Sequence, residues 1–261
     1  MKRWLGLLVT CAIAFWSPDV SARVVKIGFA GSSAPFVLPD GRNPGISVEI
    51  VREAFRLVGH DVTPVFESYG RIKEEVKRRR LDGAAAMPKG EKGIHYSTPC
   101  IAFDNVAIVR RRDDIVIRGI RDLPGHRVVA WQNAHDHLGG EFQRLFGRHV
   151  RDDYIRSYFD LADQTAQVRM FWSGRADVIV IDDVIFDYMT STMSDAFDTD
   201  IPLERHRIFG GLTVFPIVFN DRALRDQFDI GLAKLRASGG IDRIYGKYRD
   251  AGAHRKTAEV Q

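Results

Sequence analysis

Apolar residues in the first part of the chain alternate between two spacings. Residues 24–29 form a short, mostly apolar run that predicts a strand. From Ile46 onward the apolar positions recur at helical spacing until Gly59, which predicts a helix over 46–58. The next predicted elements are a strand at 62–66, a helix at 71–81 and a strand at 83–87. Strands and helices that alternate in this way indicate an α/β chain.

The same alternation continues to the end of the sequence. The predicted strands are 105–109, 126–131, 178–181 and 212–219, and the predicted helices are 138–146, 162–172, 184–189, 222–237 and 241–248. The run 178–181 contains no polar position, which is typical of a strand that is covered on both faces of a parallel sheet. One strand near Asn105 leads out of the first set of elements, and another near Gly211 leads back. Two such crossings would join two α/β lobes by a double-stranded hinge.

The first 22 residues predict a secretory signal peptide. Lys2 and Arg3 precede an uncharged run over 4–16, and Val20 and Ala22 provide small residues at the −3 and −1 positions of a cleavage site. The run is shorter than the roughly 20 apolar residues that span a membrane. The sequence around Cys11 loosely resembles a lipoprotein cleavage site, but the preceding Thr10 fits that pattern poorly. We therefore expect an exported, periplasmic chain that begins at Arg23.

Charge and cysteine content narrow the class of protein further. The chain has 38 basic and 34 acidic residues, and loss of Lys2, Arg3 and Asp19 with the signal leaves 36 and 33, a net charge of +3. The basic runs 78–80 and 110–112 are not interleaved with aromatic residues, so we read them as a solvated helix end and an exposed strand end and expect no nucleic-acid partner. Without Cys11, Cys100 is the one remaining thiol, and stability must come from burial rather than from an intrachain disulfide.

Several short segments resemble the family 3 bacterial extracellular solute-binding proteins, and together they span nearly the whole mature chain. In the first half they are Val25-Lys26-Ile27-Gly28, Ala34-Pro35-Phe36, Gly45-Ile46-Ser47-Val48-Glu49-Ile50, Leu81-Asp82-Gly83 and Tyr96-Ser97-Thr98-Pro99. In the second half they are Asp122-Leu123-Pro124-Gly125, the stretch from Gly174 to Asp182, and the stretch from Leu232 to Tyr245. Each segment is short, but their order is specific for the fold.

The resemblance implies a type II periplasmic-binding-protein-like fold with two lobes and a two-strand hinge. Lobe 1 would comprise residues 23–104 and 211–261, and lobe 2 residues 105–210, each a mixed sheet flanked by helices. It also implies a monomer without cofactor or metal that captures an amino acid or related polar solute by hinge closure and delivers it to the membrane subunits of an ABC importer. The same fold hosts cyclohexadienyl-type dehydratases and soluble sensor or accessory proteins, so these remain alternatives to a non-enzymatic binding protein.

Three residues are candidate ligand contacts by analogy with the family. Asp182 stands at the end of the apolar strand 178–181, where relatives place an aspartate that holds the ligand ammonium group, and parallel strands carry their ligands at this end. The competing reading is that Asp182 or Asp183 caps the following helix; we assign the ligand to Asp182 and the cap to Asp183. Tyr69 and Phe36 lie in loops where an aromatic ring would pack on the ligand, although Phe36 is equally compatible with packing inside its lobe.

A second group of candidates follows the strand 126–131. In relatives this turn offers backbone N–H groups and short side chains to a ligand carboxylate at a helix N-terminus, and the residues here are Trp131, Gln132, Asn133 and His135. The family usually has smaller residues at this turn, so the bulkier set changes that contact. His135 and His137 could instead suggest a metal, but two histidines without a matched set of further ligands are a weak signal.

The segment between Met87 and His95 departs most from the amino-acid-binding relatives. They carry an arginine here that binds the ligand carboxylate through two parallel hydrogen bonds, whereas this segment has only Lys89 and Lys92. A lysine is a point charge and cannot reproduce that planar fork. Lys89 could still attract an anion, and Arg71 beside Tyr69 could supply a guanidinium from another loop. We therefore expect a ligand other than a standard α-amino acid.

Overall fold

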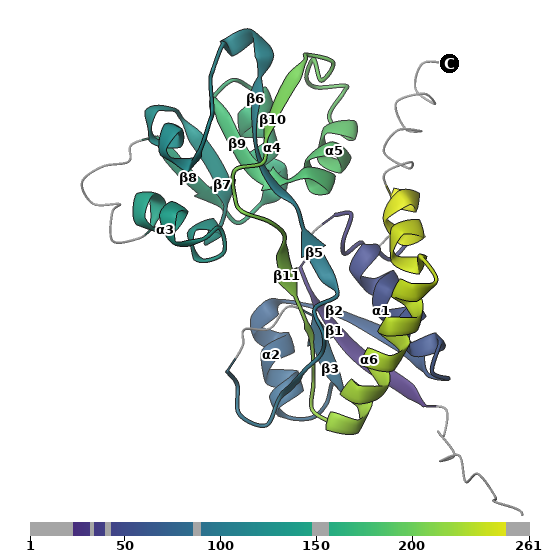
Figure 1. The fold of residues 1–261 in the computed structure, drawn as a ribbon. Helices are drawn as coiled ribbons and strands as arrows, with labels where there is room; N and C mark the ends of the chain where they lie inside the picture. The colour runs from purple at the N-terminus through teal and green to yellow at the C-terminus, as the bar shows by residue number, and fades with distance from the viewer. Residues whose placement is uncertain (1–22, 32–33, 40–42, 86–89, 148–156, 249–261) are drawn as a thin grey trace, which may run out of the picture.

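The computed structural model describes residues 23–31, 34–39, 43–85, 90–147 and 157–248. In these residues, two five-stranded sheets form separate lobes that a two-stranded ribbon joins (Figure 1). The predicted α/β class, with two mixed sheets flanked by helices and a two-strand hinge, is confirmed. The predicted signal peptide lies outside the described residues.

The sheet of lobe 1 contains four strands that run in the same direction and one that runs against them. Its order is β2 (Asp61–Glu67), β1 (Val24–Ala30), β3 (Gly83–Ala85), β12 (Ile217–Phe219) and β4 (His95–Tyr96). The flanking helices are α1 (Ile46–Arg56), α2 (Tyr69–Lys77), α6 (Arg222–Ala237) and a helix over 240–248. The end of the chain thus returns to lobe 1, where α6 lies against α1 (Figure 1).

The sheet of lobe 2 is drawn from the middle of the chain. Its order is β10 (Leu203–His206), β6 (Asn105–Arg110), β9 (Val178–Asp182), β7 (Val128–Trp131) and β8 (Tyr158–Leu161). The flanking helices are α3 (Gly140–Phe146), α4 (Gln164–Trp172) and α5 (Asp183–Ser191), with short 3-10 turns at Arg111–Asp113, Ile120–Gly125 and Ala134–Asp136. Strand β9 is central and fully buried, as its unbroken apolar run predicts.

The two lobes are joined by an antiparallel pair of strands, which we call the hinge ribbon. It consists of β5 (Ile101–Phe103) and β11 (Thr213–Phe215). The single strand predicted over 212–219 is therefore wrong: it is two strands separated by Pro216, the first in the ribbon and the second in the sheet of lobe 1. Proline has no N–H to donate to a strand ladder, so the chain can change partners at this residue.

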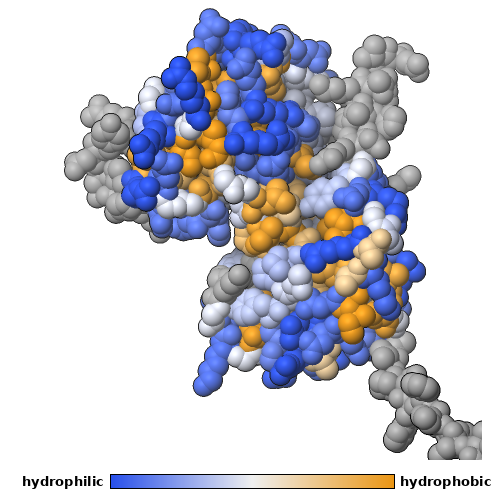
Figure 2. Space-filling view, viewed as in Figure 1, coloured by the Kyte–Doolittle hydropathy of each residue, from blue (hydrophilic) through white to orange (hydrophobic). Residues whose placement is uncertain are grey.

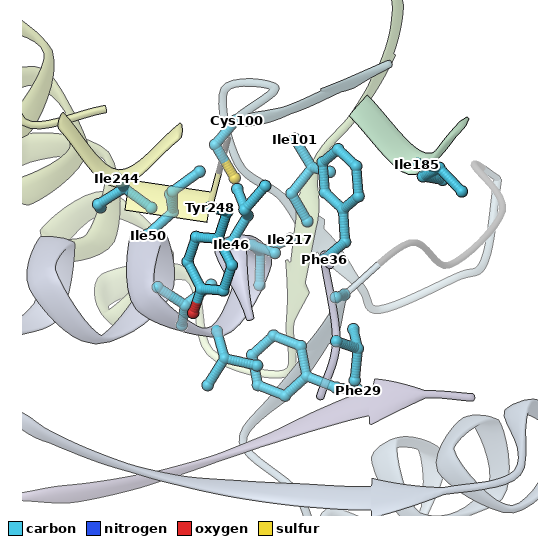
Figure 3. Close-up of a cluster of buried hydrophobic side chains, with 14 of the residues drawn as sticks. Phe29, Phe36, Ile46, Ile50, Cys100, Ile101, Ile185, Ile217, Ile244 and Tyr248 are labelled. Carbon is cyan, nitrogen blue, oxygen red and sulfur yellow. The ribbon is translucent and has the colours of Figure 1, made fainter. Parts of the chain in front are cut away.

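Buried apolar residues connect the two lobes through the hinge. The largest cluster contains residues of both sheets, of the ribbon and of helices α1, α5 and α6. Figure 3 shows part of it, where Ile101 of the ribbon lies close to Phe36 and Ile217 of lobe 1, while Ile185 of lobe 2 lies at the edge of the group. Packing of α6 on α1 is so close that a Cβ on Gly231 would lie 1.9 Å from the carbonyl oxygen of Ala54. Only glycine allows this approach.

Two local predictions fail for identifiable reasons. The helix predicted over 71–81 is the nine-residue α2, which ends at Lys77, and Arg79 adopts a left-handed conformation with φ of 56°. Arg110, predicted to lie at an exposed strand end, is 3% exposed. Its guanidinium donates to the carbonyl oxygens of Phe171 and Ala176 at 2.6 and 3.0 Å and binds Asp113, so a charged side chain is satisfied inside lobe 2.

Candidate functional site

The carboxyl ends of the parallel strands in both lobes lie beside the hinge ribbon. In lobe 1, Ile217 follows the ribbon after Pro216 and pairs with Ala85, the last residue of β3. In lobe 2, Asn105 follows the ribbon and pairs with Asp182, the last residue of β9. Strands β7 and β8 are parallel to β9 or to each other and end at the same edge. The two edges that carry ligands in α/β sheets therefore meet at the hinge.

A cavity of about 220 Å³ lies at this junction, and we call it the cleft cavity. It is lined by Phe103, Asn105, Trp131, His137, Gln164, Asp182, Ile185, Thr213 and Phe215. Three of these residues come from the hinge ribbon, and Trp131 and Asp182 end strands β7 and β9. A larger cavity near the hinge includes Asp182 but neither Trp131 nor Gln164, so we place the candidate site in the smaller one, where the strand ends converge.

Asp182 is the buried acid of the site. Its side chain is 3% exposed, and its two carboxylate oxygens accept hydrogen bonds from the backbone N–H of Ile185 at 2.9 Å and of Asp104 at 2.8 Å. Burial raises the pKa of this carboxyl group to about 7, although both backbone N–H groups oppose the shift. A partner that carries positive charge would favour the ionised form.

The assignment of the helix cap to Asp183 is wrong. Asp182 is the N-cap of α5, because its side chain accepts from the backbone N–H of Ile185. Asp183 instead forms ion pairs with Arg205 at 3.1 Å and Arg207 at 3.0 Å. Asp182 therefore caps the helix and also borders the cleft cavity.

Polar side chains on the ribbon and on α4 complete the polar part of the wall. The side-chain amide of Asn105 donates to the hydroxyl of Thr213 at 3.0 Å, which links the start of lobe 2 to the ribbon. The amide oxygen of Gln164 is buried and accepts no hydrogen bond from any described residue. A buried acceptor of this kind is costly unless a donor reaches it. A ligand N–H or O–H in the cleft cavity could supply that donor.

Aromatic rings form the apolar part of the wall. Phe103 and Phe215 lie on opposite strands of the ribbon with ring centroids 5.6 Å apart, and the His137 ring lies 5.8 Å from Phe215. Trp131 borders the cavity from β7. Such rings exclude water and attract cations to their faces, so the cavity suits a small cationic or amphipathic group.

The other residues predicted in the turn after β7 do not line this cavity. His135 is 4% exposed and buried within lobe 2, and its Nδ1 accepts or donates no hydrogen bond among the described residues. Gln132 and Asn133 lie in the turn, where Asn133 adopts a left-handed conformation and the N–H of Gln132 donates to Leu161. His137, which the sequence analysis considered only as a metal ligand, borders the cavity instead.

The candidates in lobe 1 lie away from the cleft cavity in this conformation. Phe36 is 1% exposed and packs behind Phe103 with ring centroids 4.5 Å apart, so it supports a wall of the cavity from inside lobe 1. Tyr69, at the start of α2, is 41% exposed, and burial of part of its ring raises its pKa. Arg71 lies nearby with its side chain exposed, and it pairs with Glu67 at 3.6 Å. Lys89 lies outside the described residues.

The cavity residues that the sequence analysis did not nominate share a cause. Asn105 and Thr213 flank chain crossings, and Phe103 and Phe215 face the cavity because side chains alternate along the ribbon. These residues could have been nominated if the pairing of β5 with β11 had been predicted, but the sequence analysis predicted no strand at β5 or at β8. Gln164 begins α4 directly after the Asp163 cap. It was not nominated because β8, the strand before it, was not predicted, so its position near a strand end was not apparent.

The described residues form neither a clustered metal site nor a membrane-spanning helix. They contain no group of three or more histidine, cysteine, aspartate or glutamate side chains arranged to hold a metal ion. None of their helices combines the length and the apolar character that a membrane span requires. Cys100 is the free thiol of the described chain, and burial raises its pKa to about 12.

Comparisons with known proteins agree with this architecture. Similar solved structures include a double mutant of the VFT2 domain of Bordetella pertussis BvgS (TM-score 0.66, 16% identity, 87% of this chain and 93% of that chain). Others are a histidine kinase sensor domain similar to periplasmic binding proteins (0.64, 20%, 87% and 96%) and the amino acid ABC transporter substrate-binding protein AbpA from Streptococcus pneumoniae bound to L-arginine (0.62, 17%, 88% and 95%).

These likenesses establish the type II periplasmic-binding-protein fold. No curated protein matches the sequence. The sequence model of the bacterial extracellular solute-binding proteins, family 3, matches residues 25–251. The chain therefore belongs to family 3 of the bacterial extracellular solute-binding proteins.

Proposed function

We propose that this protein captures a small polar solute in the cleft cavity and closes its two lobes around it. The convergence of Asp182, Gln164 and Trp131 beside the hinge ribbon carries the proposal, because it combines an acid, an unpaired acceptor and an aromatic wall. We further propose that the chain acts as a periplasmic monomer and delivers the solute to the membrane subunits of an ABC importer. Membership of the solute-binding family supports this role.

The solute that fits best carries a protonated amine or amide N–H groups. The Asp182 carboxyl group and the surrounding rings favour a cation, and the Gln164 oxygen accepts from a donor. No arginine lines the cleft cavity among the described residues. A ligand carboxylate would then rely on residues that closure brings in from lobe 1, and we propose Tyr69, Arg71 and Lys89 for this part. Such a ligand need not be a standard α-amino acid.

A thermal-shift screen of amines, amino acids and small amides on the full mature chain tests the proposal. A true ligand at 100 times its dissociation constant stabilises the folded state by about 2.7 kcal/mol. Calorimetry on Trp131→Ala and Gln164→Ala should then show an affinity at least about tenfold lower, which corresponds to about 1.4 kcal/mol. Val116→Ser is the matched control, because Val116 is 62% exposed and lies away from the cavity. Full affinity in both cavity variants would refute the site.

A soluble sensor component is the second candidate, because one similar structure is a histidine kinase sensor domain. Transport into vesicles that contain the partner permease separates the two roles, since only an importer component gives solute uptake that depends on this chain. The alternative of a dehydratase receives less support, because both carboxylate oxygens of Asp182 are held by backbone N–H groups as a helix cap. Conversion of prephenate or arogenate to an aromatic product would reverse that judgement.

A further inference from the structure

The hinge ribbon presents different side chains on its two faces. In the register of β5 and β11, Thr213 pairs with Phe103, and both side chains border the cleft cavity. The next pair, Val214 and Ala102, borders a second cavity, as does Leu212 just before β11. Because successive side chains of a strand point to opposite faces, Ala102 and Val214 face away from the cleft cavity, while Ile101, which is on the cleft-facing side, also borders the second cavity. We call the second one the rear cavity.

The rear cavity has a volume of about 510 Å³ and walls from both lobes. Its lining residues are Pro99, Cys100, Ile101, Ala102, Asp104, Asp182, Val184, Leu212, Val214, Arg236, Ile241, Asp242 and Tyr245. Val184 belongs to α5 of lobe 2, whereas Ile241 and Tyr245 belong to the 240–248 helix of lobe 1. The hydroxyl group of Tyr245 donates to the carbonyl oxygen of Ala102 at 3.0 Å, which fixes this helix against the ribbon.

The ribbon side of the rear cavity is apolar and open to solvent. Leu212 is 59% exposed and Val214 is 48% exposed, and both are exposed large apolar residues that border this cavity. Figure 2 shows apolar surface at the waist between the lobes, over β5 and β11. A group with an apolar body would remove these side chains from water. The hinge does not require apolar side chains at these two positions, because polar residues could form the same strand.

The charged groups at the rear cavity favour a cation. Its acids are Asp104, Asp182 and Asp242, and its one lining base is Arg236. Asp104 is already paired with Arg207 at 3.1 Å. Asp242 is exposed and forms no hydrogen bond or ion pair with another described residue, so its carboxylate is available at the rim. The guanidinium of Arg236 donates to the carbonyl oxygen of Pro99.

We propose that the rear cavity is a second ligand site, separate from the cleft cavity, and that it binds an amphipathic organic cation. The apolar body lies on Leu212 and Val214, and the ammonium group is held by Asp242 at the rim. The site draws its walls from both lobes and from the opposite face of the ribbon, so a ligand there also senses the angle between the lobes. Apart from Asp182, it shares no residue with the cleft cavity.

Calorimetry with 2-phenylethylammonium as probe and 3-phenylpropanoate as its anionic counterpart tests the site on the full mature chain. We expect the cation to bind and the anion to bind at least about tenfold more weakly. Leu212→Ser combined with Val214→Ser should weaken the cation by at least about tenfold, and Asp242→Asn by about three- to tenfold. Val116→Ser exchanges an equally exposed apolar residue outside both cavities and should leave the affinity unchanged.

A variant of the cleft cavity separates this proposal from the proposed solute capture. Trp131→Ala should leave binding of the phenylethylammonium probe intact while it weakens the solute of the cleft. Loss of probe binding in Trp131→Ala but not in the double serine variant would place the probe in the cleft and overturn the rear site. Absence of probe binding to the parent chain up to millimolar concentration would overturn it as well, and neither result would count against the cleft site.

Discussion

The two lobes prepare their sides of the cleft to different degrees. Lobe 2 brings Trp131, Gln164 and Asp182 together at the ends of neighbouring strands, and Asp182 is fixed by two backbone N–H groups. Lobe 1 presents Tyr69 and Arg71 as exposed side chains at the start of α2, away from the cavity. We propose from this comparison that lobe 2 holds a preformed half-site, and that lobe 1 would contribute its contacts when the lobes close.

The lobes also differ in how each supports its edge of the cleft. Lobe 2 buries the charge of Arg110 beneath its sheet and satisfies it with carbonyl oxygens and Asp113. Lobe 1 relies on close backbone packing between α1 and α6, which Gly231 allows. A polar anchor and a steric anchor respond to different substitutions, so they can be disrupted separately.

The largest effect is expected at the polar anchor of lobe 2. Arg110→Ala would leave the Phe171 and Ala176 carbonyl oxygens and Asp113 without their buried donor, and it should lower the free energy of unfolding by about 3–5 kcal/mol. Urea denaturation measures the change. Arg111→Ala is the control: its side chain is 66% exposed, and its ion pair with Glu204 should contribute less than about 1 kcal/mol. Equal losses in the two variants would contradict the buried role of Arg110.

The steric anchor of lobe 1 should be nearly as sensitive. Gly231→Ala places a Cβ against the carbonyl oxygen of Ala54, and separation of α6 from α1 should cost about 3 kcal/mol. Gly246→Ala is the matched control in the neighbouring 240–248 helix, because its added Cβ would meet no atom within 4 Å. Thermal unfolding should show a lower midpoint for the first variant and an unchanged or higher midpoint for the second. A stable Gly231→Ala chain would show that the helices can separate without loss.

The sequence predicted many strands and helices of both sheets correctly, because these elements have strong apolar periodicity. The run over 178–181 is a covered strand, as its lack of a polar face predicted, and the helix predicted over 222–237 has the bounds of α6. The ribbon was harder to predict, since three-residue strands such as β5 carry too few positions to show a period. Arg110 was misread for a related reason: a pattern of charges does not reveal which arginine finds buried acceptors.

Only the part of the candidate site that follows long, periodic strands could be predicted from the sequence. Asp182 and Trp131 follow long, recognisable strands and line the cleft cavity. Phe103, Thr213 and Phe215 belong to the ribbon, so their common location depends on pairing between segments more than 100 residues apart. Neither spacing nor composition records such a pairing. The contributions of Tyr69, Arg71 and Lys89 stay predictions, because they depend on closure.

The preformed acid of lobe 2 predicts a specific pH dependence of stability. The pKa of Asp182 is raised to about 7 in the folded chain, so the folded state binds this proton more tightly than the unfolded state does. Stability from this group is therefore present at low pH and is lost as pH rises towards and through 7. Asp182→Asn cannot ionise and should gain about 2 kcal/mol relative to the parent chain between pH 5 and pH 8. Urea denaturation at both pH values measures the difference, and a constant difference would contradict the raised pKa.

The smallest effect on stability is expected for a substitution in lobe 1, and its effect on solute binding tests the difference between the two lobes most directly. Arg71→Gln removes an exposed side chain and a long ion pair with Glu67, so the free energy of unfolding should change by less than about 0.5 kcal/mol. Arg78→Gln is a control on the same element, because Arg78 is similarly exposed and pairs with Glu74 near the other end of α2. If lobe 1 contacts the solute only after closure, Arg71→Gln should weaken solute binding by about two- to fivefold while Arg78→Gln leaves it unchanged. Calorimetry that shows equal affinities for both variants would mean that the half-site of lobe 2 binds the solute without help from Arg71.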